Sequence, residues 1–167
     1  MAQQYTIAGN RLTWNGPALQ AWVHAEMRRR LARAAELVAS KIKVNISISS
    51  RGQGPSRPGE YPHAMNGRLR NSIFWVFVKG DKLAVIVGTP LEYGAILERG
   101  HPGGRVITPR RGQFLRWTTP SGEVVFARRV VQGALAPRPY LARTLSEQQD
   151  AVNRILTGPM NPPKSFN

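Results

Sequence analysis

One long amphipathic stretch constrains the fold of this chain more than any other feature of its sequence. Between Pro17 and Val44, apolar side chains recur every three or four residues, which is the spacing of one face of an α-helix. Pro17 suits the first helical turn, where its missing N–H would have no partner. The stripe comprises Val23, Met27, Leu31, Ala34, Val38 and Ile42. We therefore predict one long helix that needs a second layer to cover its apolar face.

The second layer is predicted to be an antiparallel β-sheet. Leu69–Val78 and Leu83–Val87 have the composition of two strands around a turn at Lys79–Lys82. Side chains of the first strand alternate between two faces, and both faces are apolar. One face carries Ile73, Trp75 and Phe77, and the other carries Phe74, Val76 and Val78. The long helix can cover one face, so the other calls for a second sheet layer or another subunit.

Shorter elements complete an α+β fold. A hairpin over Tyr5–Trp14, turning at Gly9–Asn10, precedes the long helix. The later elements are a helix at Leu91–Arg99 closed by Gly100, strands at Arg105–Ile107, Gln113–Thr118 and Glu123–Val131, and a last helix at Pro139–Leu156. The predicted architecture is a long N-terminal amphipathic helix packed on an antiparallel β-sheet, which is built mainly from Leu69 to Val131. A short middle helix and a C-terminal helix accompany the sheet.

These elements predict a single domain over residues 1–157. Residues 1–16 form its N-terminal hairpin extension, and residues 47–67 form a long loop rich in glycine and proline. Loops of this length in compact domains are typically functional or disordered. Residues 158–167 are proline-rich and polar, so we expect an extended C-terminal tail.

The charge of the chain is strongly unbalanced. Lysine and arginine number 24 against nine aspartates and glutamates, which gives a formal net charge of +15. Such a balance implies a polyanionic neighbour, most often nucleic acid. The run Arg28–Arg30 lies within the long helix, where a charge run is usually a solvated face. The chain has no cysteine, no secretory-signal layout and no apolar run of membrane-spanning length, so we expect a cytoplasmic product with no membrane partner.

The sequence offers no recognisable catalytic, metal or cofactor site. The three histidines have no ligand-like spacing, and the nine acidic residues are scattered. A serine-hydrolase elbow and a P-loop are both missing, and Gly52–Gly54 lacks the flanks of a dinucleotide-binding loop. We therefore predict a non-enzyme without cofactor or metal.

Three segments, taken in order, resemble a known family. Pro55–Ile73 is similar to a Pro/Gly-rich segment that ends in T-G-x-L-R-x-S-I, with Asn66 in place of the usual threonine. Leu91–Gly100 resembles a Y-A-x-x-x-E-x-G element, with Gly94 in place of alanine, and Arg138–Leu145 resembles an R-P-F-L-x-x-A-L signature. The family comprises tail-completion and head–tail joining (neck) proteins of tailed bacteriophages, including tail-component and Mu-type virion morphogenesis proteins.

The resemblance implies a structural virion protein that is assembled in the host cytoplasm. Its subunits would form a homo-oligomeric ring, expected to be a hexamer, in the neck where the head joins the tail. The ring would contact other neck and tail proteins, and double-stranded DNA would pass through it non-specifically. The alternative is a free basic nucleic-acid-binding protein without catalytic activity, which the charge alone would support.

Two sets of residues follow as candidates. Candidates for lining the DNA channel are Arg68, Arg70, Arg110, Arg111, Arg116, Arg128 and Arg129. Candidates for subunit contacts are Arg51, Arg57, Tyr61, Trp75, Phe77, Tyr93, Glu98 and Tyr140. The arginines have a second interpretation as solvated or salt-bridging residues. Since Arg128 and Arg129 are adjacent on a predicted strand, only one of them can face the channel.

Overall fold

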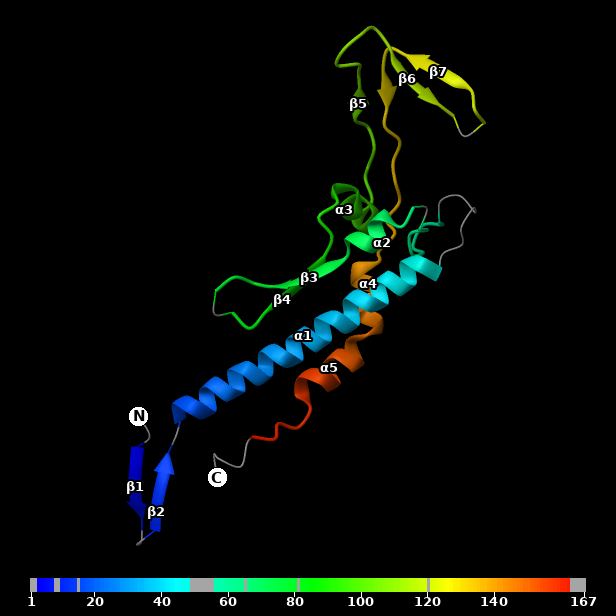
Figure 1. Ribbon diagram of the computed structural model, residues 1–167. Coiled ribbons are helices and arrows are strands. Elements are labelled where there is room, and N and C mark those ends of the chain that lie inside the picture. The colour runs from blue at the N-terminus through cyan, green and yellow to red at the C-terminus, as the bar shows by residue number, and fades with distance from the viewer. Residues whose placement is uncertain are drawn as a thin grey trace.

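The computed structural model describes residues 3–7, 10–14, 16–48, 56–64, 66–80, 82–119 and 121–162. Helix α1 (Gly16–Ile48) is the long element on which a β-ribbon and three further helices pack (Figure 1). This confirms the predicted helix, which continues to Ile48 rather than ending at Val44. The fold class is α+β, as the sequence predicts.

An N-terminal hairpin precedes α1, also as predicted. It consists of β1 (Gln3–Ile7) and β2 (Asn10–Trp14), which pair in antiparallel fashion. Ile7 pairs with Asn10, so Asn10 belongs to the second strand and not to the turn. The predicted turn at Gly9–Asn10 therefore does not include Asn10, and residues 8 and 9 lie outside the described part of the chain.

The apolar hairpin packs one of its faces on α1. It is formed by β3 (Phe74–Phe77) and β4 (Val85–Gly88). The Trp75 indole N–H donates a 2.7 Å hydrogen bond to Glu36 on α1, and the Arg28 guanidinium lies 4.0 Å from the centre of the Phe77 ring. The opposite face is open, since Phe74, Val76 and Ile86 are 44%, 43% and 55% exposed. The predicted alternation along this strand is confirmed.

The residues before β3 form a helix and not a strand, which corrects the prediction for Leu69–Ser72. Helix α2 (Arg68–Ser72) follows Gly67, whose φ of 73° favours glycine, and the Asn66 side chain accepts a hydrogen bond from the Arg68 N–H. A helical turn places residues four apart on one side. Leu69 and Ile73 consequently both enter the core, at 8% and 2% exposure.

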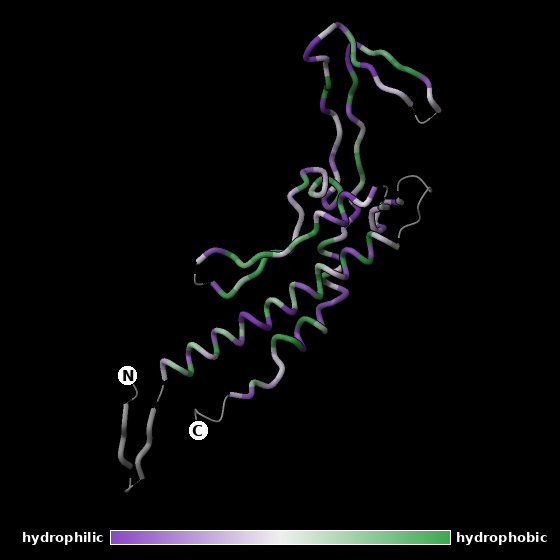
Figure 2. Tube along the Cα trace, in the orientation of Figure 1, coloured by the Kyte–Doolittle hydropathy of each residue, from purple (hydrophilic) through white to green (hydrophobic). Residues whose placement is uncertain are grey.

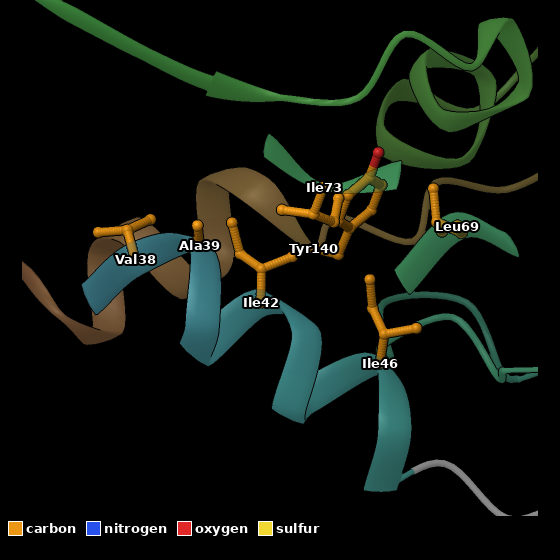
Figure 3. Close-up of a cluster of buried hydrophobic side chains, with 7 residues drawn as sticks. All are labelled: Val38, Ala39, Ile42, Ile46, Leu69, Ile73 and Tyr140. Carbon is orange, nitrogen blue, oxygen red and sulfur yellow. The ribbon is translucent and has the colours of Figure 1, made fainter. Parts of the chain in front are cut away.

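The core lies where the C-terminal half of α1 meets α2 and the start of α4 (Figure 3). Its members are Val38, Ala39, Ile42, Ile46, Leu69, Ile73 and Tyr140. Only the second half of the predicted helical stripe is buried, because Val23 remains 36% exposed. The N-terminal half of α1 extends beyond the core (Figure 1).

The predicted C-terminal helix is divided in two. Helix α4 (Leu141–Glu147) and helix α5 (Gln149–Thr157) meet at Gln148, which leaves helical geometry with φ −100° and ψ 5°. Thr144 is fully buried, whereas Leu145 is 52% exposed. The break allows α4 to contribute to the core while α5 runs alongside α1 (Figure 1).

Helix α3 (Glu92–Arg99) is joined to α4 by one carboxylate. Gly100 closes α3 with φ 77°, which confirms the predicted stop. Glu98 accepts hydrogen bonds of 2.8, 2.9 and 2.9 Å from the backbone N–H groups of Tyr140, Leu141 and Ala142. These groups have no partner within α4, and the helix dipole also favours a negative charge at this end.

An extended arm leaves the body between α3 and α4. We define the arm as residues 101–135. His101 and Leu135 exchange two 2.8 Å backbone hydrogen bonds at its base, and β5 (Val106–Ile107) pairs with β8 (Val130–Val131) along its stem. At the tip, β6 (Leu115–Thr118) pairs with β7 (Val124–Ala127).

This arrangement corrects the prediction of one sheet covering α1. The described strands form four separate two-stranded ribbons, and of the three that follow α1 only β3–β4 packs on it. The predicted strand Glu123–Val131 is broken at Arg128–Arg129, because β7 pairs with β6 whereas β8 pairs with β5. The arm ribbons point away from the body (Figure 1).

Arg30 departs from the predicted solvated face of the arginine run. Its side chain is 7% exposed and bonds to Glu26. Its guanidinium donates to the backbone carbonyls of Leu156, Gly158 and Pro159, at 3.1, 2.6 and 2.7 Å. Arg30 thus holds the end of α5 against α1, whereas Arg29 remains 64% exposed.

We expect Gly94→Ala to destabilise the fold. A Cβ at Gly94 would lie 2.5 Å from Thr89 Cγ2 and 2.8 Å from the Tyr140 hydroxyl, so the loss should be about 1–3 kcal/mol in urea unfolding. Tyr140→Phe combined with Thr89→Ser removes both obstructing atoms and should restore most of the loss. Additive effects of the three changes would contradict this packing. The family signatures agree with this packing, because alanine at the position of Gly94 occurs together with phenylalanine at the position of Tyr140.

We expect Glu98→Gln to lower the free energy of unfolding by about 1–2 kcal/mol, because the neutral amide offers one acceptor to three N–H groups. Glu92→Gln, on the exposed first turn of the same helix, is the matched control and should cost a few tenths of a kcal/mol. Equal losses from the two variants would show that Glu98 does not cap α4.

Candidate interaction surfaces

The candidate channel arginines fall in two places. Arg68 and Arg70 lie on α2 in the body, and the Arg70 guanidinium contacts Asn71 and Ser47. The other five lie on the arm: Arg110, Arg111, Arg116, Arg128 and Arg129. Arg110 and Arg111 occupy the exposed connection between β5 and β6. The structure therefore separates the two sets and brings only the second together on one element.

The arm is strongly basic. It contains six arginines and one acidic residue, Glu123. Within the described residues, ion pairs connect carboxylates only to Arg29, Arg30 and Arg143, and none of these lies on the arm. An anion that neutralises the arm arginines would thus have to come from another molecule.

The arm also exposes apolar side chains at both its stem and its tip. Hydrophobic and hydrophilic residues follow one another along its trace (Figure 2). The exposed large residues are Val106, Ile107, Phe114, Trp117, Val124, Phe126 and Val131. Phe126 is 61% exposed, which is the highest value among the large apolar side chains of the described chain. The sequence predicts strands in this region but not the exposure of these residues. The only local signal is that arginines lie beside them, as Arg116 lies beside Trp117.

Aromatic rings and arginines are interleaved on the arm. Arg116 pairs across the ribbon with Phe126, and the Arg128 guanidinium lies 5.6 Å from the centre of the Phe114 ring. Such cation–π contacts at exposed sites are worth about 0.5–1 kcal/mol. The arm surface is therefore neither a purely ionic nor a purely apolar patch.

Tyr140, a predicted subunit contact, belongs to the core. Its side chain is fully buried within its own chain, beside Gly94 on α3. Burial, with the nearby Glu98 carboxylate, raises the pKa of the Tyr140 hydroxyl to about 12. Glu98, another predicted contact, uses its carboxylate within the chain to cap α4.

Tyr61 belongs to a hydrogen-bond chain that ties the long loop to α1 and α4. Asn45 donates to Thr144 at 3.2 Å, Thr144 donates to Tyr61 at 3.2 Å, and Tyr61 donates to Glu147 at 2.7 Å. Burial raises the pKa of Tyr61, whereas the hydrogen bonds from Tyr61 and Arg143 hold the pKa of Glu147 below its usual value. Arg143 also lies 4.6 Å from the centre of the Tyr61 ring.

The other contact candidates have varied surroundings. Trp75 and Phe77 face α1 of the same chain, and Tyr93 is 39% exposed on α3. Arg57 is exposed, and its backbone N–H donates to the Glu60 carboxylate. Arg51 lies outside the described residues. Whether these side chains contact a second subunit stays a prediction.

The described part of the chain provides no cluster of three or more metal-ligating side chains. It also contains no helix whose length and apolarity would allow it to cross a membrane. A groove of about 390 Å³ lies between α2, α3 and the long loop, and Arg138 and the buried Ser56 are among the residues that line it.

Comparison with known proteins gives one family. Residues 18–100 match the model described as "Bacteriophage HK97-gp10, putative tail-component". No curated protein and no solved structure matches the chain. The matched span holds α1, α2, β3, β4 and α3, and therefore two of the three segments on which the sequence resemblance rests. Over this span, just under half of the chain, the sequence is similar to the HK97-gp10-like family of bacteriophage tail components.

Proposed function

We propose that this protein is a non-enzymatic structural component of a phage virion that forms a closed homomeric ring in the neck. The ring joins or completes the tail at the head–tail interface and surrounds the channel through which DNA passes. Six-fold symmetry is expected from the resemblance. The observation that carries the proposal is the arm, an extended element whose apolar side chains are left exposed by its own chain.

The arm supports assembly because its apolar side chains remain exposed to water when a single chain folds. A two-stranded ribbon without cover is marginally stable in water, and large exposed apolar patches mark interaction sites. The open face of β3–β4 gives a second such surface. Two different uncovered surfaces on one chain favour a contact between unlike faces, which closes into a ring when the rotation is suitable.

The charge supports a position around DNA. The arm arginines have no carboxylate partner among the described residues, so the DNA backbone or an acidic neighbouring ring would neutralise them. Assembly would take place in the host cytoplasm, and the mature ring would contact other neck and tail proteins. A free nucleic-acid-binding protein would share the charge but would not need the apolar surfaces to assemble.

We expect Phe74→Ser with Val76→Ser to impair ring assembly while barely changing the unfolding midpoint, because both side chains lie on the open face. Trp75→Ala with Phe77→Ala is the matched pair on the inner face and should lower stability by several kcal/mol. Light scattering and electron microscopy report the assembly, and electron microscopy of native particles would locate the ring. A wild-type chain that stays monomeric in solution and is missing from particles would refute the ring.

We expect charge reversal of Arg110 and Arg111 to weaken duplex DNA binding and leave the ring intact, because both residues are exposed on the arm connection. Loss of two phosphate contacts should reduce the slope of log K against log salt by about 2, independent of sequence. Titrations at several salt concentrations measure this. If the reversed chain fails to assemble, and wild-type binding does not depend on salt, these arginines serve protein contacts and the channel assignment fails.

A further inference from the structure

An open apolar groove of about 440 Å³ lies on the body of the protein. Its floor is α1, at Ala34 and Ala35, and its walls are Val85 of β4 together with Leu141, Leu145 and Leu156 of α4 and α5. Every residue that lines it is apolar. Leu145 on its rim is 52% exposed. An apolar groove open to water is a typical site for a large side chain of a binding partner.

The arm offers an apolar side chain of the matching kind. Phe126 is 61% exposed and lies on β7, two residues after Val124, so the two side chains share one face of the ribbon. A buried aromatic residue removes about 150–250 Å² from water, and aromatic anchors in pockets dominate many interfaces. Phe126 therefore has the chemistry and the exposure of an interface anchor.

The arm cannot place this side chain in the groove of its own chain. It begins and ends beside α3 and α4 near the C-terminal end of α1, and its tip points away from β4 and α5 (Figure 1). Within the described residues, the groove and the anchor are therefore both left uncovered. A second molecule is the occupant that can cover both.

We propose that Phe126 of one subunit inserts into the groove between α1, β4 and the α4–α5 pair of a second copy of this chain. The inference rests on the proposed ring and names the surfaces that meet in it. In a closed ring the contact between groove and anchor is heterologous, so every subunit gives its anchor to one neighbour and receives an anchor from the other. A stable interface covers about 800 Å² per partner, so Phe126 acts within a larger contact to which Val124, on the same face of the ribbon, contributes.

Disulfide cross-linking tests the contact directly, because the chain has no cysteine of its own. The double variant Phe126→Cys, Leu145→Cys should give a ladder of covalent oligomers after oxidation with copper phenanthroline. Phe126→Cys with Ser40→Cys is the matched control, since Ser40 is exposed on α1 and does not line the groove. The control should give at most a faint dimer band.

Complementation gives a second readout that does not depend on cysteine. Phe126→Ser and Leu145→Arg change exposed side chains, so both variants should keep the wild-type melting temperature. Each alone should weaken self-association about thirtyfold, the typical effect of losing an interface anchor. An equimolar mixture should form heterodimers, since one intact anchor can meet one intact groove, and should form no larger species.

The outcomes separate this contact from the ring itself. A wild-type ring with no ladder from the double variant, and with normal assembly of Phe126→Ser, would overturn the contact and leave the ring standing. A wild-type chain that stays monomeric and gives no ladder would overturn both. A ladder together with heterodimers in the mixture would establish the contact.

Discussion

The bond between the Glu98 carboxylate and the first turn of α4 is the interaction on which the rest of the structure depends. It joins the two helices that flank the arm, and so it closes a loop between residues that lie 42 positions apart in the chain. The Arg138 N–H adds a 2.7 Å bond to the Leu97 carbonyl beside it. Closing a long loop costs little more entropy than closing a short one, because the cost grows only with the logarithm of length. A few strong backbone contacts at the base therefore suffice to carry a long arm.

The same junction explains why an arm with little burial can still have a defined direction. Tyr140 is the first residue capped by Glu98, and it is fully buried among Ile42, Ile73 and Leu69. The arm strands enter and leave next to this cluster, at His101 and Leu135. Their orientation is thus fixed by the core of the body, whereas the tip is left free to present Phe126 and its arginines to another molecule.

The sequence could predict those elements whose signal is local. The stripe from Val23 to Ile42 indicated α1, and the alternation in β3 indicated which side chains face the helix. The residues before β3 are predicted as a strand because Leu69 and Ile73 fit the apolar pattern of a strand as well as that of a helix. Only the tertiary structure shows that a helical turn brings both side chains into the core. The break between α4 and α5 at Gln148 could not be predicted, because no glycine or proline marks it in the sequence. The buried role of Arg30 depends on carbonyls more than 120 residues away, which no local pattern reveals.

The contact residues could be predicted less well than the helices, because their burial depends on tertiary contacts that no local pattern reveals. The segments Leu91–Gly100 and Arg138–Leu145, which resemble family signatures, suggested contact residues, yet Glu98 and Tyr140 use their side chains to build the core junction. Seven of the exposed large apolar residues lie instead on the arm, beyond the family match that ends at Gly100. Because the junction closes the arm at its base, substitutions at the tip leave the core contacts unchanged. Such an element can adapt to a binding surface, including the groove of a second copy, while the body keeps one fold.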